Sequence, residues 1–203
     1  MFDNNSTLIK ELAKRLELKE IIADSTLESA SLEISSFEEL KEFIRRFSNR
    51  YAPSTNLVEL LEEEVDIVLH KLKFIASESR PKILLLESIT PPALLESTLI
   101  AETIQIAGGL PIPLQDYQQA QILIIKQDEF TLYGQLPDFV NQDQWKQIPA
   151  IKNNQVYLIK KEDFAGVPGT NFLTELELLA EIIQPKYFVF GHQGIHWIKF
   201  DLI

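Results

Sequence analysis

Three short apolar runs, separated by segments with helical spacing, constrain the fold of this 203-residue chain most strongly. They span residues 83–86, 122–125 and 156–159. An uninterrupted apolar run of this length is typical of a strand that is covered on both faces. Because helix-like segments lie between and after these runs, strand and helix alternate from residue 82 onward. The alternation predicts an α/β fold, a three-layer domain with a mainly parallel sheet.

Glycine and proline mark the ends of the predicted helices in this region. A helix over residues 98–107 ends at Gly108 and Gly109, one of which is expected to adopt the left-handed conformation of a C-cap. A second helix, over residues 170–183, stops before Pro185. We expect Asn171 to serve as its N-cap and Pro91-Pro92 to lie in a loop. Residues 187–190 and 197–200 are predicted to form a closing hairpin.

The first 80 residues are predicted to be mostly helical. Residues 6–18 have the spacing of an amphipathic helix, and residues 21–26 and 32–34 look like short strands. Ser36 and Glu39 form a capping box that opens a further helix. From Asn56, apolar residues recur at steps of three and four to about residue 77, which predicts a helix on the order of 30 Å long.

Composition excludes several classes of function. The net charge of −11 argues against nucleic-acid binding, which needs clustered lysine and arginine. The sequence has no cysteine, so disulfides and thiolate chemistry are excluded. It shows no secretion signal and no apolar run of about 20 residues that would span a membrane. We therefore expect a cytoplasmic protein from the sequence as written, or a periplasmic or cell-surface one if a leader precedes it.

No motif points to catalysis or to a resident cofactor. Nucleophile elbows, phosphate-binding loops and dinucleotide fingerprints are all missing, so we expect the protein not to be an enzyme. His192 and His196 have the spacing of a helical metal site, but the flanking glycines favour a turn, and we expect no intrinsic metal. Trp145 has two interpretations, an aromatic plug at the sheet edge or a wall of a ligand cleft.

The ordered set of segments resembles a known family. It comprises the strand at 83–87, a proline-rich loop, the helix ending in Ala-Gly-Gly, Trp145 followed by Ile-Pro-Ala-Ile-Lys-Asn-Asn-Gln-Val-Tyr, and Pro-Gly-Thr-Asn at 168–171. This order is similar to the C-terminal lobe of the solute-binding proteins that deliver iron-siderophores, heme or cobalamin to ABC importers. In that family, two α/β lobes are joined by one long helix, and the chelate lies between them.

The resemblance implies three parts and a set of site residues. It implies a reduced N-terminal lobe at residues 1–53, a connecting helix at 54–79 and a C-terminal lobe at 80–203. Glu102 occupies the place of a carboxylate that docks the importer permease, the implied partner. The implied bound group is an iron-siderophore, heme or cobalamin. The implied cleft residues are Pro91, Pro92, Trp145, Pro168, Gly169 and Asn171.

The chain also departs from the family pattern. Most of an N-terminal lobe would lie between residues 26 and 32, and the helix before the strand at 122–125 is reduced to residues 115–119. Asn171 stands where many members carry an arginine that clamps anionic chelates. Three alternatives follow: a compact binding protein completed by another chain, a non-enzymatic interaction protein that lost transport, or an unrelated enzyme. A homodimer that covers the vacated lobe face is a further expectation.

Overall fold

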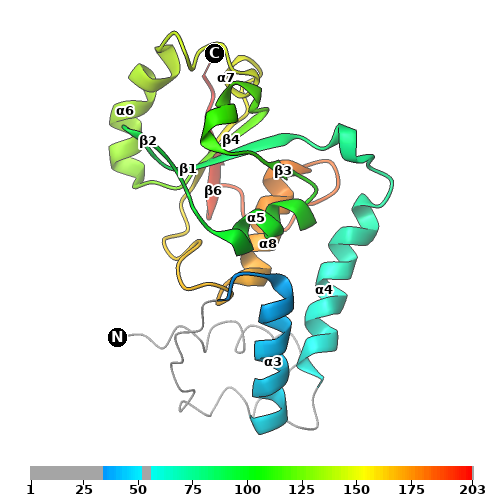
Figure 1. Cartoon of the computed structure of the whole chain (residues 1–203). Helices are drawn as coiled ribbons and strands as arrows, with labels where there is room; N and C mark the ends of the chain where they lie inside the picture. Colours follow the sequence, from blue (N-terminus) through cyan, green and yellow to red (C-terminus); the bar gives the residue numbers. More distant parts are fainter. Residues whose placement is uncertain (1–33, 52–55, 203) are drawn as a thin grey trace.

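The computed structural model describes residues 34–51 and 56–202. The helix predicted over residues 6–18, the strands predicted over 21–26 and 32–33, and most of the reduced N-terminal lobe lie outside these residues. Within them, a six-stranded sheet is the centre of the molecule, and α3 (Phe37–Tyr51) and α4 (Leu57–Leu72) extend from one side of it (Figure 1). No described helix is both long and apolar enough to cross a lipid bilayer.

The sheet is mainly parallel, as predicted. Its order is β2-β1-β4-β5-β6, and β3 pairs with β1 beside β2. The central strands β1, β4 and β5 run parallel, as does β3, whereas β2 and β6 are antiparallel. The strand bounds are β1 Lys82–Ile89, β2 Pro92–Leu94, β3 Leu110–Pro111, β4 Ile122–Ile125, β5 Val156–Ile159 and β6 Trp197–Lys199.

Alternating side chains of the central strands build two cores. Ile83 and Leu85 of β1 face one core, and Leu84 and Leu86 face the other; β4 and β5 alternate in the same way. The first core is covered by α3, α4, α5 (Thr98–Ile106) and α8 (Phe172–Ile183). The second lies under α6 (Glu129–Asn141), α7 (Pro149–Lys152) and the 3₁₀ helix η2 (Leu114–Gln119). The predicted three-layer α/β fold is confirmed.

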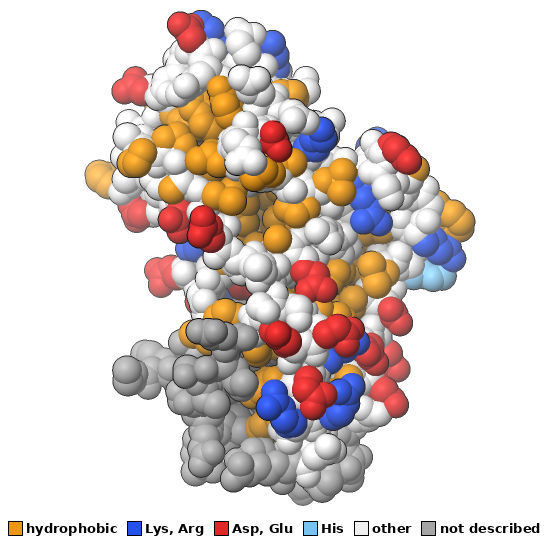
Figure 2. Space-filling model, in the orientation of Figure 1, with side chains coloured by type: hydrophobic (Ala, Val, Ile, Leu, Met, Phe, Trp, Pro, Cys, Tyr) orange, Lys and Arg blue, Asp and Glu red, His pale blue; other side chains and the backbone are white. Residues whose placement is uncertain are grey.

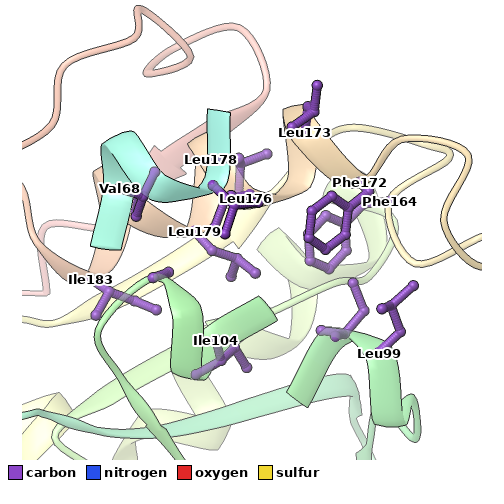
Figure 3. Packing of buried hydrophobic residues seen from close by; sticks show 14 of the residues in the cluster. Val68, Leu99, Ile104, Phe164, Phe172, Leu173, Leu176, Leu178, Leu179 and Ile183 are labelled. Atoms are coloured by element: carbon purple, nitrogen blue, oxygen red, sulfur yellow. The ribbon is translucent and has the colours of Figure 1, made fainter. Parts of the chain in front are cut away.

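Helix α8 is the centre of the first core. Figure 3 shows Leu176 and Leu179 of α8 in the region between Val68 of α4 and Ile104 of α5, with Phe172 against Phe164 at the N-terminal end of the helix. All ten of its buried positions lie within 12 residues, so α8 is covered on nearly every side. This packing explains why the helix stays short and ends before Pro185.

Two helix ends match the sequence predictions. Asn56 accepts a hydrogen bond from the backbone N of Glu59 and caps α4. Gly108 has φ +86° after α5, where a Cβ would come within 2.9 Å of Leu72. Glycine therefore serves both the left-handed turn and the close approach of α4.

The predicted capping box at the start of α3 is only half formed. The Ser36 hydroxyl accepts from the Glu39 backbone N at 3.2 Å. The Glu39 carboxylate, however, accepts from the Ser35 backbone N and hydroxyl, both at 2.7 Å, and not from Ser36. These bonds to Ser35 lower the pKa of Glu39 below its ordinary value.

Helix α4 is shorter than predicted. It ends at Leu72, so it spans about 24 Å and not 30 Å. The Ile75 backbone N donates to Leu72 O in a turn, and a 3₁₀ helix at Ser77–Ser79 follows. Phe74 is 88% exposed beyond the end, so no core remains there to hold further helical turns. The spacing of three residues between the apolar Leu72 and Ile75 had suggested that the helix continues, but a turn stands there in the structure.

One further sequence prediction was wrong, and helix α6 was missed. The loop predicted at Pro91-Pro92 is a tight turn: Pro91 lies in the turn, and Pro92 begins β2, which pairs antiparallel with the end of β1. Residues 187–190 form no strand, so the closing hairpin does not exist, and β6 pairs with β5 instead. Helix α6 was missed because Gly134 and Pro137 weaken its signal; Asp128 caps it by accepting from Thr131 N at 2.8 Å.

The Glu181 carboxylate explains the lost hairpin. Its side chain is 4% exposed and accepts from the backbone N of Phe190, from Gly191 N at 2.5 Å, from His192 N at 3.1 Å and from the indole N of Trp197 at 2.8 Å. Of the predicted strand 187–190, Phe190 N is thus directed at this carboxylate, while Tyr187 N and Phe188 N both donate to Gln184 O after α8, so none of these donors is available to a hairpin. This carboxylate ties the segment before β6 to α8.

Replacing Glu181 by glutamine is expected to lower the free energy of unfolding by about 3 kcal/mol, because an amide places two N–H donors against existing donors. Urea denaturation would measure the change. The control is Glu63→Gln on the exposed face of α4, which should shift stability by less than about 0.5 kcal/mol. Equal stability of the two variants would contradict this role of Glu181.

Candidate functional site

The order in which the strands are added to the sheet reverses between the parallel neighbours β1 and β4. From β1 the chain crosses over α5 to β3 at one edge, and from β4 it crosses over α6 and α7 on the opposite face to β5. In open α/β sheets, ligands bind in the crevice outside the carboxyl ends of the strands at such a reversal. The carboxyl ends of β1 and β4 are therefore the first place to look for a site.

A cleft of two parts opens there. Its polar half, about 520 Å³, lies over the carboxyl ends of β1 and β4 and against the loop after β5. Four polar residues of its lining lie at the end of β1 or in the two positions after β4. They are Glu87, Ser88, Lys126 and Gln127, and the remaining lining residues are Leu95, Glu96, Asp128, Phe164 and Ala165.

The apolar half of the cleft, about 550 Å³, continues from the polar half along α5. Leu95, Glu96 and Ala165 line both halves, so the two form one continuous cleft. Its walls are β1, the start of α5, the segment before α3 and the loop before α8. The apolar side chains that line it include Ile34, Ile83, Leu85, Leu94, Ile100, Ile104, Ile112 and Pro168.

Hydrophobic side chains gather on the same side of the molecule. Figure 2 shows them over β1 and β2 and continuing toward α5, with acidic side chains at the border of the patch. The outer edges of β2 and β3 also lie here, since both strands pair only with β1. An apolar surface with a charged border and an adjoining polar cleft suits an amphipathic ligand.

Lys126 is the one cation that lines the cleft within the described part of the chain. It is partly buried at the end of β4 and forms no ion pair with another described residue. Burial lowers the pKa of its amine below the ordinary 10.5, while the nearby Asp163 and Glu162 raise it. An ammonium group in this position can donate to an oxygen of a ligand.

The side chain of Gln127 connects the two elements that border the polar half of the cleft. Its carbonyl oxygen accepts from Ile89 N at 3.1 Å, and its amide donates to Gln135 of α6 at 2.9 Å. Gln127 thus links the end of β1 to α6, and both groups of its side chain are satisfied. Its role is to position the cleft, and Lys126 beside it keeps donors available to a ligand.

Buried polar groups of α8 hold the loop that closes the cleft. The carboxylate of Glu175, 3% exposed, accepts from Ala165 N at 2.8 Å. Ala165 has φ +53°, which is rare for a residue with a side chain, so this bond helps to maintain a strained turn. Asn171 donates to Asp163, to Oδ2 at 2.9 Å and to the backbone O at 3.2 Å. The loop is therefore fixed before any ligand binds.

Asn171 is not the capping residue that the sequence predicted. It occupies the N-cap position of α8, but its side chain makes no capping hydrogen bond, because its amide is turned toward Asp163. It is 5% exposed and lines neither half of the cleft. Gly169, at φ +81°, packs against Leu40 of α3, where a Cβ would lie 2.7 Å away. Pro168 lines the apolar half.

The other sequence-predicted residues lie away from the cleft lining. Trp145 is 3% exposed in the second core, with its ring 4.5 Å from Phe139 and 4.6 Å from Tyr117, so it is an aromatic plug and not a cleft wall. Pro91 and Pro92 stand at the turn between β1 and β2. Among the six predicted cleft residues, only Pro168 contributes to the lining as described.

Glu102 is engaged within the chain. Its carboxylate accepts from the backbone N of Phe37 at 2.8 Å, at the start of α3. A carboxylate at a helix N-terminus is stabilised by the unpaired amides and the helix dipole. The Phe37 ring also stacks on Phe172, with ring centres 5.2 Å apart. Glu102 thus fastens α3 to α5.

Histidines do not gather at the cleft. His192 Nε2 lies 3.1 Å from Glu177 Oε2, and the ring of His196 is 5.3 Å from that of His192. His70 is exposed on α4. Residues 34–51 and 56–202 contain no group of three or more His, Cys, Asp or Glu side chains that could hold a metal ion.

The polar residues at the ends of β1 and β4 were missed from sequence. A signal existed, because Lys126-Gln127-Asp128 directly follows a buried strand and Glu87-Ser88 ends another. In parallel sheets such positions meet at one edge. Applying this rule required the strand order, which the sequence does not show.

No family model and no curated protein matches the chain. Solved structures do. An ABC transporter substrate-binding protein from Listeria monocytogenes EGD-e is 18% identical with a TM-score of 0.63, and the match covers 84% of this chain and 73% of that one. A periplasmic binding protein from Veillonella parvula DSM 2008 is 14% identical with a TM-score of 0.60, covering 83% and 58%.

S. aureus IsdE complexed with heme is 19% identical with a TM-score of 0.54, and the match covers 74% of this chain and 66% of that one. The present chain therefore spans about three-fifths to three-quarters of the length of these proteins. Its fold is that of the substrate-binding proteins of ABC importers, which is the fold that the ordered segments predicted.

Replacing Asn171 by alanine is expected to lower the free energy of unfolding by about 1–2 kcal/mol and to loosen residues 163–168, because two hydrogen bonds are lost. Hydrogen–deuterium exchange of that loop would measure the loosening. Asn141→Ala, which removes an exposed side chain at the end of α6, is the control and should leave the loop unchanged. Unaltered exchange in Asn171→Ala would contradict its positioning role.

Proposed function

We propose that this protein binds a metal chelate in the cleft at the carboxyl ends of β1 and β4 and delivers it to an ABC importer. The observation that carries the proposal is the cleft itself, in which Lys126 forms no ion pair with another described residue and lies near a long apolar wall, on the fold of ABC-importer substrate-binding proteins. The apolar half matches the organic body of a chelate, and Lys126 matches one of its oxygen atoms.

The side chains of the chain favour a chelated metal over a bare ion. The sequence has three histidines and no cysteine, and none of these histidines lines the cleft. Histidine and cysteine ligands are lacking there, and the described residues hold no group of three His, Cys, Asp or Glu side chains that could bind an ion, so a metal that brings its own coordination sphere fits the cleft better. IsdE was solved with heme and another structural neighbour with nickel and histidine, so cargo of this general kind is accommodated by the fold.

Import would place the protein outside the cytoplasmic membrane, as for the periplasmic binding protein from Veillonella parvula. A permease would be the partner. Glu102, the residue expected to dock it, holds α3 in the free protein. One carboxylate oxygen of Glu102 is thus engaged within the chain, so we propose that other carboxylates of the acidic surface also serve as docking groups.

The engagement of Glu102 favours one alternative, a binding or interaction protein that retained the fold and lost transport, acting as a dimer. The apolar patch over β1 and β2 would be its interface (Figure 2). Sedimentation equilibrium at micromolar concentration separates the two functions. A monomer that binds chelates supports transport, whereas a dimer that binds none supports the alternative.

Titration with ferrichrome, hemin and cobalamin tests the proposal directly. We expect at least one chelate to bind with a dissociation constant at or below the micromolar range, measured by calorimetry. Ferric nitrilotriacetate, which can donate its ferric ion to a protein site, is the control for binding of the bare ion, and no ferric ion should be retained. Folded protein that binds none of the three, and no other ferric chelate such as ferric enterobactin, would refute chelate delivery.

Replacing Lys126 by methionine is expected to weaken the binding of ferrichrome about tenfold, because a charge-assisted hydrogen bond is lost while the apolar stem is kept. Burial lowers the pKa of Lys126 below 10.5, so the ammonium loses its charge as the pH rises. As the pH is raised, binding by the native protein should therefore begin to weaken before pH 10.5 is reached. Lys152→Met, on α7, is the control. An unchanged affinity in Lys126→Met would exclude this contact.

A further inference from the structure

Acidic side chains outnumber basic ones around the polar half of the cleft. Three carboxylates line it, Glu87, Glu96 and Asp128. Glu129 follows Asp128 directly, and Glu162 and Asp163 lie in the loop after β5, close enough to Lys126 to raise its pKa against the lowering by burial. The described lysines in this region are Lys126, Lys160 and Lys161. Six carboxylates thus face three ammonium groups.

Two of the three lysines already have partners. Lys160 Nζ lies 3.1 Å from Glu129 Oε2, and Lys161 Nζ lies 2.6 Å from Asp163 Oδ1. Lys126 forms no ion pair with another described residue, but the negative charges of Asp163 and Glu162 are close enough to favour its charged form. Among the described residues, the cleft lining therefore offers one ammonium group and no cluster of cations. A clamp for an anion needs several fixed positive charges or a bidentate guanidinium, and no described arginine lines either half.

We infer that the cleft selects an electroneutral or cationic ferric chelate, of the trihydroxamate class, and rejects polyanionic chelates such as ferric tricatecholates. The inference rests on the proposed function and narrows its ligand. A trihydroxamate neutralises the ferric ion and leaves no excess charge, whereas a tricatecholate complex is trianionic. Carboxylates within about 10 Å repel a trianion, and partial burial limits the screening by salt.

The apolar half supports the same class of ligand. Its aliphatic lining can contact the uncharged methylene chains of a hydroxamate chelate without leaving a buried charge unpaired. Lys126, in the polar half, can donate to one hydroxamate or amide oxygen. A tricatecholate complex carries its net charge of −3 on the catecholate oxygens around the iron, so it would bring that charge close to Glu87 and Glu96.

Calorimetry with a charge series tests the inference on the full chain. The probes are ferrioxamine B, which is cationic, ferrichrome, which is neutral, and ferric enterobactin, which is trianionic. We expect ferrichrome or ferrioxamine B to bind at least about tenfold more tightly than ferric enterobactin at 0.15 M salt. Tightest binding of ferric enterobactin would overturn the inference and leave the proposed function standing. Failure of every probe, together with hemin and cobalamin, would refute the function itself.

A double variant tests the electrostatic cause. In Glu87→Gln/Glu96→Gln, the ratio of ferric enterobactin affinity to ferrichrome affinity should rise about tenfold, and the rise should shrink with added salt. The matched control is Glu63→Gln/Asp66→Asn on the exposed face of α4, which changes the net charge equally and should leave the ratio unchanged. An equal rise in both double variants, or none in either, would contradict selection by the cleft carboxylates.

Discussion

The parallel pairing of β4 between β1 and β5 is the constraint on which the rest of the structure depends. Because both faces of these strands are buried, helices must cover both sides, and the chain must cross over α5 on one face and α6 on the other. The crossovers leave the ends of β1 and β4 uncovered at one edge. The polar residues there and the apolar wall beside them form the cleft.

The cleft is kept open by hydrogen-bonded groups, of which only Gln127 also lines it. Glu175, Asn171 and Gln127 are all hydrogen-bonded behind its walls, and Glu102 fastens α3 to the same side of the sheet. Such preorganisation lowers the entropy that a ligand must lose on binding, since the loop before α8 is already ordered. It also explains why residues that looked like ligand contacts in the sequence have positioning roles in the structure.

Most of the fold of residues 80–203 could be predicted from sequence, because buried runs such as 122–125 and stop signals such as Pro185 act locally. The site could not be predicted in the same way. Trp145 lies in the core and Asn171 donates to Asp163, and neither outcome depends on nearby sequence. The hairpin prediction was also wrong because of a contact with another element: the Glu181 carboxylate of α8 accepts hydrogen bonds from the backbone N–H groups of residues 190–192.

Hydrogen–deuterium exchange with and without ferrichrome tests the central claim most directly, because it locates the ligand without assuming which residues bind it. The account predicts protection of residues 87–97, 126–128 and 163–168, which surround the cleft, and little change in α6 or in residues 187–196. Protection confined to the segment before β6, or to the exposed face of α4, would place the ligand elsewhere and contradict the account.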